Sequence, residues 1–320
     1  MAEIGRDIGR AKALLEEGKL VAIPTETVYG LAGNGFDVKA VASIFETKKR
    51  PAFDPLILHT DSLDKVADFV AEIPESVRQL AEKFWPGPLT VLFKKGEKVP
   101  DLVTSGLDTV AVRIPRHPLT RELLSSLDFP LAAPSANPFG YVSPTNPDHV
   151  NAQLGNDIPF ILDGGACTVG VESTILSFEQ EVPTVLRMGG LTLEALEEVL
   201  GEVAVNAHSS SSPAAPGMLK SHYAPRKSFV LIDDEKAFTK PENDDFAVLA
   251  FDHMLDTVPE SRQFLLAPSG ETQEAATRLF EMMRMLDSRD EISQIIALKV
   301  PNVGLGRAVN DRLKRAAAQG

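Results

Sequence analysis

Short apolar runs that end in polar loops rich in glycine and proline constrain the fold of this chain most strongly. The run KLVAIP leads into TETVYG, and further runs follow at PLILH, LTVLFKK, TVAVRIP, PLAAPSA, FILDGG, ESTILSF and TVLRMGG. Helical patterns separate several of them, such as DVKAVASIFETK, in which Asp37 can cap the helix. Strands that alternate with helices predict an α/β fold. Because ESTILSF and TVLRMGG have no helix between them, we expect the sheet to be mixed.

The first segment of the chain has the pattern of an amphipathic helix. From Ile4 to Glu17, apolar residues recur at helical spacing, and Gly18 is well placed to end a helix. The spaced residues are Ile4, Ile8, Ala11, Leu14 and Leu15. We therefore expect one helix across this whole segment.

The length of 320 residues favours two domains of different sizes. A boundary is expected near residue 205, where SSSS is followed by Pro213, Pro216 and Gly217. Four apolar runs and two helical patterns lie beyond it. We predict an N-terminal domain over 1–205, a linker over 206–226 and a smaller Rossmann-like α/β domain over 227–320.

Cysteine usage and hydropathy indicate a cytoplasmic protein. Cys167 is the single cysteine and cannot form an intramolecular disulfide, which fits a reducing compartment. It has no neighbouring base, so a structural role is favoured. Neither a secretory h-region nor an 18-residue apolar stretch is found, so no membrane association is expected.

The net charge of −13 argues against broad binding of nucleic acid or anionic membrane. One basic cluster, KKR from Lys48 to Arg50, stands out against this background. Taken alone, such a cluster is more often a solvated surface run than a binding site.

Polar side chains flank several of the expected strands, in loops of the kind where α/β sheets bind ligands; Arg50 and Asp54 precede PLILH, and His59 ends it. They are Thr25, Glu26, Thr27, Arg50, Asp54, His59, Ser135 and Asn137. Arg113 lies inside an apolar strand, where its guanidinium needs a partner such as a bound carboxylate or phosphate. There is neither a Walker A sequence nor a GxGxxG between a strand and a helix. The residues alone therefore indicate an α/β protein that binds a small anion.

These loops, taken in order, resemble those of the YrdC/Sua5 family. The matching stretches are IPTETVYGLAGNGFD, KKRPAFDPLILH, FWPGPLTVLF, GLDTVAVRIPRHP, AAPSANPFGYVSPT, DGG, GVESTI and VLRMGG. They cover most of residues 5 to 200, and APGMLKSHYAP with the domain after it resembles the longer Sua5 type. The resemblance implies a YrdC-like domain with a twisted mixed sheet and flanking helices.

The activity that the resemblance implies is synthesis of threonylcarbamoyl-AMP for the N6-threonylcarbamoyladenosine modification of tRNA. L-threonine, bicarbonate or CO2, and ATP give the product and pyrophosphate. Mg²⁺ is expected with ATP and not in a metal site of the protein, and no protein nucleophile is expected. The product would pass to the tRNA threonylcarbamoyl transferase machinery, and a weak RNA contact is left open.

The family's binding residues carry over to matching positions in this sequence. For threonine they are Thr27, His59, Arg113, Ala133 and Ser173. For ATP they are Lys48, Arg50, Asp54, Thr109, Ser135, Ser143, Arg187 and Tyr223. Lys48 and Arg50 are then candidate electrostatic stabilisers, so the KKR cluster becomes a phosphate clamp.

Two features of the match raise questions of their own. Asp54 stands where many relatives have Asn, and an ionised carboxylate cannot donate a hydrogen bond to a phosphate. It would approach ATP through Mg²⁺ or pair with Arg50. The linker SSPAAPGMLKSHYAP carries Lys220, His222 and Tyr223, which a mere tether does not need, so we expect it to fold over the crevice as a lid.

Two other functions compete with this expectation. An RNA-binding module of YrdC-like fold is one, although the acidic charge speaks against it. A carbamoyl-transfer enzyme of hydrogenase maturation is the other, but the acylphosphatase and zinc-finger segments expected beside such a domain are absent from the sequence.

Overall fold

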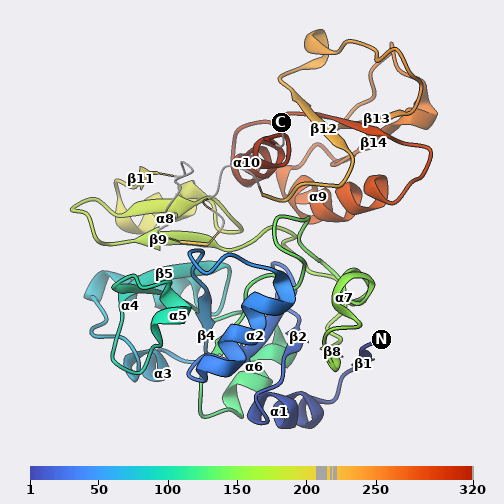
Figure 1. Ribbon diagram of the computed structural model, residues 1–320. Coiled ribbons are helices and arrows are strands. Elements are labelled where there is room, and N and C mark those ends of the chain that lie inside the picture. The colour runs from blue at the N-terminus through green and yellow to red at the C-terminus, as the bar shows by residue number, and fades with distance from the viewer. Residues whose placement is uncertain (207–214, 217, 219–221, 319–320) are drawn as a thin grey trace. The chain divides into compact units, whose positions relative to one another are not determined.

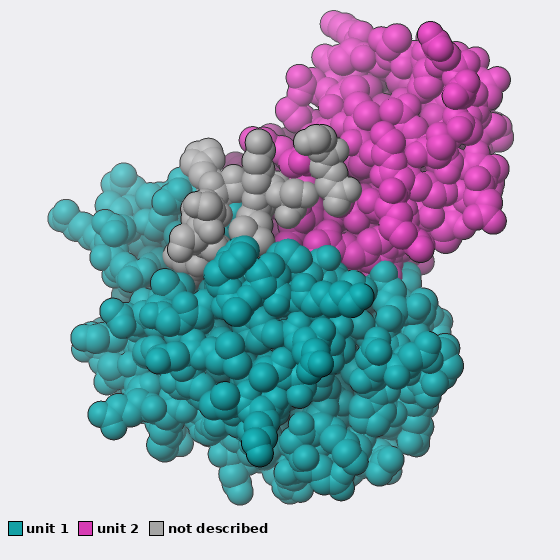
Figure 2. Space-filling model, viewed as in Figure 1, with its two compact units in different colours: residues 1–139, 143–168, 172–219 teal, residues 140–142, 169–171, 220–320 magenta. Residues whose placement is uncertain are grey.

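The computed structural model describes residues 1–206, 215–216, 218 and 222–318, which belong to two compact units (Figures 1 and 2). Unit 1 contains residues 1–139, 143–168 and 172–219, and unit 2 contains residues 140–142, 169–171 and 220–320. Lys220 and the remaining parts of the expected linker, 207–214, 217, 219 and 221, lie outside the described residues.

Unit 1 is built on a mixed sheet, as predicted. Its strand order is β1-β8-β2-β3-β7-β4-β6-β5-β9-β10-β11. The strands are β1 (Glu3–Gly5), β2 (Val21–Ile23), β3 (Gly30–Asn34), β4 (Ile57–His59), β5 (Leu89–Lys94), β6 (Thr109–Arg113), β7 (Leu131–Ala132), β8 (Phe160–Leu162), β9 (Thr174–Ser177), β10 (Thr184–Arg187) and β11 (Ala204–Val205). Strand β6 pairs with β4 in parallel and with β5 in antiparallel fashion. Strands β9 and β10 form the expected antiparallel pair.

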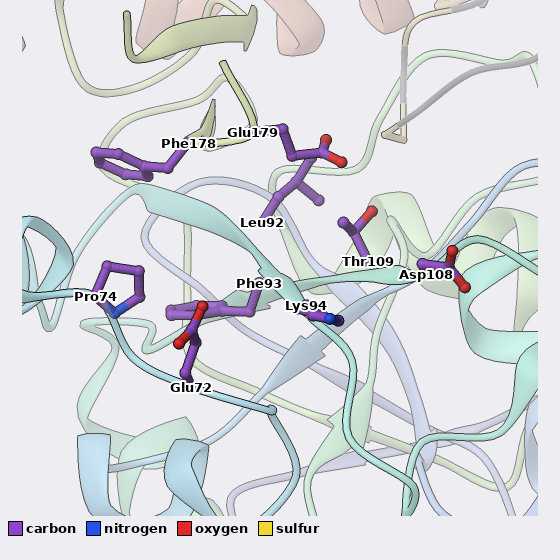
Figure 3. Close-up of a pocket in the computed structure, with 9 residues that line it drawn as sticks. All are labelled: Glu72, Pro74, Leu92, Phe93, Lys94, Asp108, Thr109, Phe178 and Glu179. Carbon is purple, nitrogen blue, oxygen red and sulfur yellow. The ribbon is translucent and has the colours of Figure 1, made fainter. Parts of the chain in front are cut away.

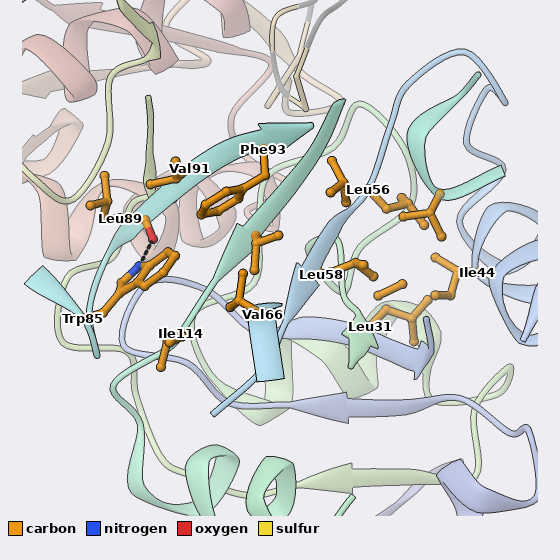
Figure 4. Close-up of a cluster of buried hydrophobic side chains, with 14 of the residues drawn as sticks. Leu31, Ile44, Leu56, Leu58, Val66, Trp85, Leu89, Val91, Phe93 and Ile114 are labelled. Atoms are coloured by element: carbon orange, nitrogen blue, oxygen red, sulfur yellow. Dashed lines mark hydrogen bonds between the residues drawn. The ribbon is translucent and has the colours of Figure 1, made fainter. Parts of the chain in front are cut away.

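Helices pack on both faces of this sheet (Figure 1). They are α1 (Ile8–Glu16), α2 (Val38–Lys48), α3 (Leu63–Ala67), α4 (Glu75–Phe84), α5 (Asp101–Thr104), α6 (Pro118–Ser125), α7 (Pro147–Leu154) and α8 (Leu193–Leu200). The larger core joins the sheet to α2, α4 and their neighbours, and Trp85 closes one end of it by donating to the Leu89 carbonyl at 2.7 Å (Figure 4). Helices α1 and α6 cover β8, β2, β3 and β7 on the other face.

The expectation of one helix from Ile4 to Glu17 was wrong at its beginning. Ile4 lies in β1, which pairs in parallel with β8 and places Ile4 opposite Ile161. The helix begins at Ile8 because the Asp7 side chain accepts from the Arg10 N–H and caps it. Helical spacing was satisfied by chance at Ile4, since one apolar residue also fits an edge strand.

One strip of the sheet has apolar side chains that no helix of the described chain covers. It consists of β4, β6, β5, β9 and β10, whose residues Ile57, Ala111, Leu92, Ile175 and Leu186 share a small cluster. The cluster is completed by Ala215 and Met218, both buried, from the stretch expected to be the linker. We call this surface the open strip. Side chains two residues along each strand from this cluster face the same way.

Unit 2 contains a parallel four-stranded sheet in the order β12-β15-β13-β14. Its strands are β12 (Ser228–Ile232), β13 (Phe246–Ala250), β14 (Gln263–Leu265) and β15 (Gln294–Leu298), and its helices are α9 (Thr272–Asp287) and α10 (Gly306–Ala316), with short 3₁₀ turns at Glu235–Ala237 and Glu260–Arg262. This confirms the predicted second α/β domain. None of the helices among the described residues is long and apolar enough to cross a membrane.

Candidate active site

Three polar side chains form a row across the open strip. Arg113 is the register partner of His59 on β4 and of Thr90 on β5. Each residue of the row lies two positions along its strand from Ile57, Ala111 or Leu92. The row therefore faces the same side of the sheet as these apolar residues. All three residues are buried.

The Arg113 guanidinium is surrounded by acceptors. Nη1 donates to Thr27 Oγ1 at 2.8 Å, and Nε donates to the Gly87 carbonyl at 3.2 Å. Nη2 lies 2.8 Å from Glu26 Oε1, although the two groups are not aligned as a hydrogen bond. A misaligned charge contact leaves this end of the guanidinium able to turn to another carboxylate.

Glu26 is held in the loop between β2 and β3. Its Oε2 accepts from the Arg116 N–H at 3.0 Å. Burial would raise the pKa of Glu26, but the charge of Arg113 and the hydrogen bonds to the carboxylate lower that pKa below its ordinary value. Thr25 shapes the same loop, because its hydroxyl accepts from the N–H groups of Thr27 and Val28. The loop therefore presents Thr27 and an ionised Glu26 to Arg113.

His59 is a neutral imidazole at the end of β4. Burial, with the charge of Arg113 beside it, lowers the pKa of His59 to about 3. Its Nδ1 lies 3.2 Å from the Ile57 carbonyl. The side chain can act as a hydrogen-bonding wall of the site but does not carry charge at neutral pH.

Ser173 connects the row to the next strands. Its Oγ lies 2.7 Å from Thr90 Oγ1. Arg187 donates from Nη2 to the Ser173 carbonyl at 3.0 Å and to its hydroxyl at 3.1 Å. Arg187 also donates to the Pro216 carbonyl at 3.1 Å. Arg187, an expected ATP residue, thus binds both Ser173, an expected threonine residue, and Pro216 of the linker.

Ala133 follows β7 and is buried. A Cβ added at Gly30 would lie 3.2 Å from the Ala133 Cβ, so the two backbones approach closely. A small residue is needed here because this part of the sheet is packed tightly against α1 and α6.

Three expected phosphate-binding cations act on one carboxylate, that of Asp54. Arg50 Nη2 lies 2.9 Å from Asp54 Oδ2, and both side chains are buried. Burial raises the pKa of Asp54, and the charges of Arg50, Lys48 and Arg187 oppose this rise. The structure therefore shows the pairing of Asp54 with Arg50, one of the two arrangements left open by the sequence.

The KKR cluster is not a solvated surface run, since Lys49 alone is exposed. Lys48 is buried, and its Nζ donates to the carbonyls of Ser135 and Asn137, each at 2.5 Å. Burial and the charge of Arg50 lower the pKa of Lys48 well below its ordinary value, while Asp54 raises it. Lys48 thus fixes the loop that carries Ser135.

The remaining expected ATP residues lie in separate places. Ser143 is buried and donates to Glu172 Oε1 at 2.6 Å. Thr109 lines a pocket of about 370 Å³ together with Glu72, Pro74, Leu92, Phe93, Lys94, Asp108, Phe178 and Glu179 (Figure 3). Three of these side chains are carboxylates, so the pocket does not suit phosphate groups.

Tyr223 lies in unit 2. It is buried and stacks on Phe280 of α9 with 5.5 Å between ring centroids, and the Arg312 guanidinium lies 5.3 Å from its ring. Its φ of 64° is in the left-handed region, which is uncommon for a bulky residue. Its role as an ATP contact stays a prediction.

Comparison with known proteins identifies the family. A family model described as "Telomere recombination" (Sua5_yciO_yrdC) matches residues 13–189, and one described as "Threonylcarbamoyl-AMP synthase, C-terminal domain" (Sua5_C) matches residues 191–318. The chain belongs to the Sua5 family. The threonylcarbamoyl-AMP synthase of Pyrococcus abyssi is 41% identical over 96% of this chain and 92% of its own length. That of Bacillus subtilis is 36% identical over 97% and 92%. The crystal structure of P. abyssi Sua5 complexed with L-threonine superposes with a TM-score of 0.91 at 38% identity, covering 99% of this chain and 97% of that chain.

Three buried residues of this Sua5 chain contact expected binding residues without being among them, and Glu26 alone of the three was named as a polar side chain of a loop. They are Glu26, which pairs with Arg113, Thr90, which meets Ser173, and Glu172, which accepts from Ser143. Thr90 had a usable signal, because strand alternation in LTVLF puts it on the face of Leu92. The two glutamates lay in the quoted loops TETVYG and GVESTI, but a loop carboxylate has no spacing signal of its own.

Proposed function

We propose that this chain, like the relatives named above, makes threonylcarbamoyl-AMP and pyrophosphate from L-threonine, bicarbonate or CO2, and ATP. The observation that carries the proposal is the contact between Arg187 and Ser173, because it joins the row around Arg113 to the cations around Asp54 on one open strip. An amino acid carboxylate suits the first group and a polyphosphate suits the second.

Threonine binds at the row. Its carboxylate takes the place of Glu26 on the Arg113 guanidinium, which presents a planar fork for a carboxylate. Thr27 and Ser173 supply hydroxyls on either side, and neutral His59 closes the end of the pocket without repelling the ammonium group of threonine. A charged imidazole there would oppose binding of an amine.

ATP binds with its phosphates among Arg50, Lys48 and Arg187. Ser135 and Ser143 contribute hydroxyls from the loop that follows β7. Thr109 is four residues before Arg113 on the same strand and faces the same side, so it contacts the nucleoside end. The walls formed by Leu92 and Phe178 suit a base, and the acidic lining of that pocket keeps the phosphates toward the cations.

The reaction needs positioning and charge more than a protein nucleophile. The neutral threonine amine forms a bond to the carbon of CO2 and loses a proton, which gives an N-carboxylate. From bicarbonate the same bond forms as a C–O bond breaks, and the oxygen leaves as water with the proton of the amine. An oxygen of this carboxylate then attacks the α-phosphorus of ATP, and the bond to the bridging oxygen of pyrophosphate breaks. Arg187 lies between the two substrates, where it stabilises charge on the attacking and transferred groups.

The described residues do not offer a site that would hold Mg²⁺ by itself. Asp54 is paired with Arg50 and lies under the charge of two more cations, which makes it a poor ligand for a further cation. Mg²⁺ would come bound to the phosphates of ATP, and we assign no step to it.

Ala215, Pro216 and Met218, the described residues of the linker at this place, cover part of the open strip in this proposal. Ala215 and Met218 pack on Ile57, Leu92 and their neighbours, and the Pro216 carbonyl accepts from Arg187. A cover at this place keeps water from the N-carboxylate and the acyl-adenylate.

The test is pyrophosphate release by the full chain with each substrate omitted in turn. Release that requires ATP, threonine and bicarbonate together supports the proposal. ATP turnover that is indifferent to threonine overturns it. Other proteins are expected to transfer the product to tRNA. That transfer would be tested only after this result.

A further inference from the structure

Two short segments of the N-terminal part of the chain belong to unit 2. They are residues 140–142 and 169–171 (Figure 2). Ser143 follows the first segment and Glu172 follows the second, and these two residues meet again in unit 1 through a buried hydrogen bond of 2.6 Å. Ser143 is a proposed ATP residue, and Glu172 precedes the proposed threonine residue Ser173. Whatever holds the two segments therefore acts on both substrate sites.

Helix α9 holds the first segment through Asp287. The Tyr141 hydroxyl donates to Asp287 Oδ2 at 2.6 Å. The carboxylate is fully buried, and its Oδ1 accepts from the main-chain N–H groups of Arg226 at 2.8 Å and Lys227 at 3.1 Å. These donors lower the pKa of Asp287 against the effect of burial, so the acceptor for Tyr141 is an ionised carboxylate.

A second residue of α9 strengthens this contact. The Arg284 guanidinium lies 5.0 Å from the centroid of the Tyr141 ring and donates to the Val142 carbonyl. The side chain is buried, so the cation–π contact is formed with little competition from water. Main chain and side chain of segment 140–142 are thus both bound to α9.

Helix α9 also contacts the second segment, two to three turns nearer its N-terminus. Gly170 has φ of 81°, and a Cβ there would collide with the main chain of Ala276 and Thr277. Two separate features require glycine at position 170: the left-handed backbone conformation and the close approach of α9. Segment 169–171 is therefore held against α9 by close packing of the two backbones.

We propose that α9 is a clamp on the two substrate loops, in which Asp287 and Arg284 hold Tyr141, and Ala276 and Thr277 hold Gly170. In this role Tyr141, Asp287 and Gly170 are positioning residues, which act through the chain on Ser143 and Glu172. The clamp brings Ser143 and Glu172 together and so forms the two substrate sites jointly. This proposal rests on the proposed function for the identity of the substrates.

The test compares Tyr141→Phe and Asp287→Asn with the unchanged full chain. Each change removes a hydrogen bond to a buried charged group, so we expect the KM for ATP to rise about 10-fold, with a much smaller change in kcat. The double variant should be less impaired than the two single effects multiplied together, because both remove the same contact. Gly170→Ala should raise the KM for threonine.

A matched control is Asp244→Asn, which breaks an exposed ion pair with Lys240 in the same unit. It should leave both KM values unchanged. Unchanged KM values in Tyr141→Phe and Asp287→Asn, or equal rises in the Asp244→Asn control, overturn the clamp. Thermal unfolding identifies any variant that fails to fold, and Tyr141→Phe, which loses one oxygen from a half-buried side chain, then decides the question.

Failure of the clamp and failure of the proposed function have different signatures. Loss of the function shows in the unchanged chain as pyrophosphate release that ignores threonine. The clamp is also measured without turnover, as the Kd for ATP by calorimetry. A Kd that is about 10-fold weaker in Tyr141→Phe supports it, and an unchanged Kd overturns it.

Discussion

Arg113 and Glu26 form a buried ion pair, with 2.8 Å between Arg113 Nη2 and Glu26 Oε1. Both side chains are almost closed to solvent. Breaking such a pair by removing one charge is costly, because the other charge stays buried without compensation. The pair therefore neutralises Arg113, and in the proposed function a substrate carboxylate would take the place of Glu26.

Glu26→Gln tests this exchange. The free energy of unfolding of the ligand-free protein should fall by about 3 kcal/mol, because Arg113 loses its counter-charge. Saturating L-threonine should then stabilise the variant by more than it stabilises the unchanged protein, as measured by thermal unfolding with and without the amino acid. Equal shifts in both proteins would show that threonine does not use this guanidinium.

Asp54→Asn should improve ATP binding. The carboxylate offsets the charges of Arg50, Lys48 and Arg187, and a neutral amide would leave more positive charge for the phosphates. Removal of one unit charge several Å from a phosphate is expected to lower the KM for ATP by about 10-fold.

The control for Asp54→Asn is the pH dependence of its KM for ATP, compared with that of the unchanged protein. Because the pKa of Asp54 is raised, the carboxyl becomes neutral earlier than usual as pH falls. The difference in KM between the two proteins should therefore shrink toward acid pH and widen toward neutral pH. A variant that binds ATP more weakly, or that needs more Mg²⁺ for half-maximal rate, would argue that Asp54 is a metal ligand.

His59 should make the protein sensitive to acid. Its pKa is about 3 in the folded chain and near 6.5 when unfolded, so the unfolded state binds the proton between these values. This contribution to stability is complete above pH 6.5, falls by about 1.4 kcal/mol for each pH unit below it, and is exhausted near pH 3. The free energy of unfolding, measured by denaturant titration between pH 4.5 and 7, should show a smaller slope in His59→Gln. The same slope in both proteins would place His59 in solvent contact.

Met218→Asn tests the cover over the open strip. Met218 is buried against the sheet, and a polar side chain there should loosen the linker. We expect less threonylcarbamoyl-AMP for each pyrophosphate released, because water reaches the intermediates. Met254, which is 40% exposed, gives the matched control Met254→Asn. If the ratio of product to pyrophosphate is the same in all three proteins, the linker is only a tether.

The fold was predictable to the extent that it depends on local pattern. The apolar runs LTVLFKK and TVAVRIP placed Thr90, Thr109 and Arg113 correctly in strands, and Asp37 does cap its helix at Lys39 N–H. The beginning of the first helix was not predictable, because the pairing of Ile4 with Ile161 joins positions far apart in the sequence.

The sequence indicated which residues belong to the candidate site but not which contacts they make with one another. Arg113 was expected to need a carboxylate, but its partner Glu26 is brought there by a loop from another strand. Lys48 was expected at a phosphate, which stays a prediction, and its hydrogen bonds to the Ser135 loop were not foreseen. Such contacts depend on tertiary packing, which a single sequence does not encode in any local spacing.

The most direct measurement follows isotope from labelled bicarbonate into the product. The full chain is incubated with ATP, L-threonine and ¹³C-bicarbonate, and the adenylate is examined by mass spectrometry beside the pyrophosphate released. The account predicts threonylcarbamoyl-AMP that carries one labelled carbon, formed in step with pyrophosphate, and loss of both in Arg113→Ala. Pyrophosphate or AMP formed without threonine or without the label would contradict it, and salt-sensitive binding of tRNA with no turnover would favour an RNA-binding module instead.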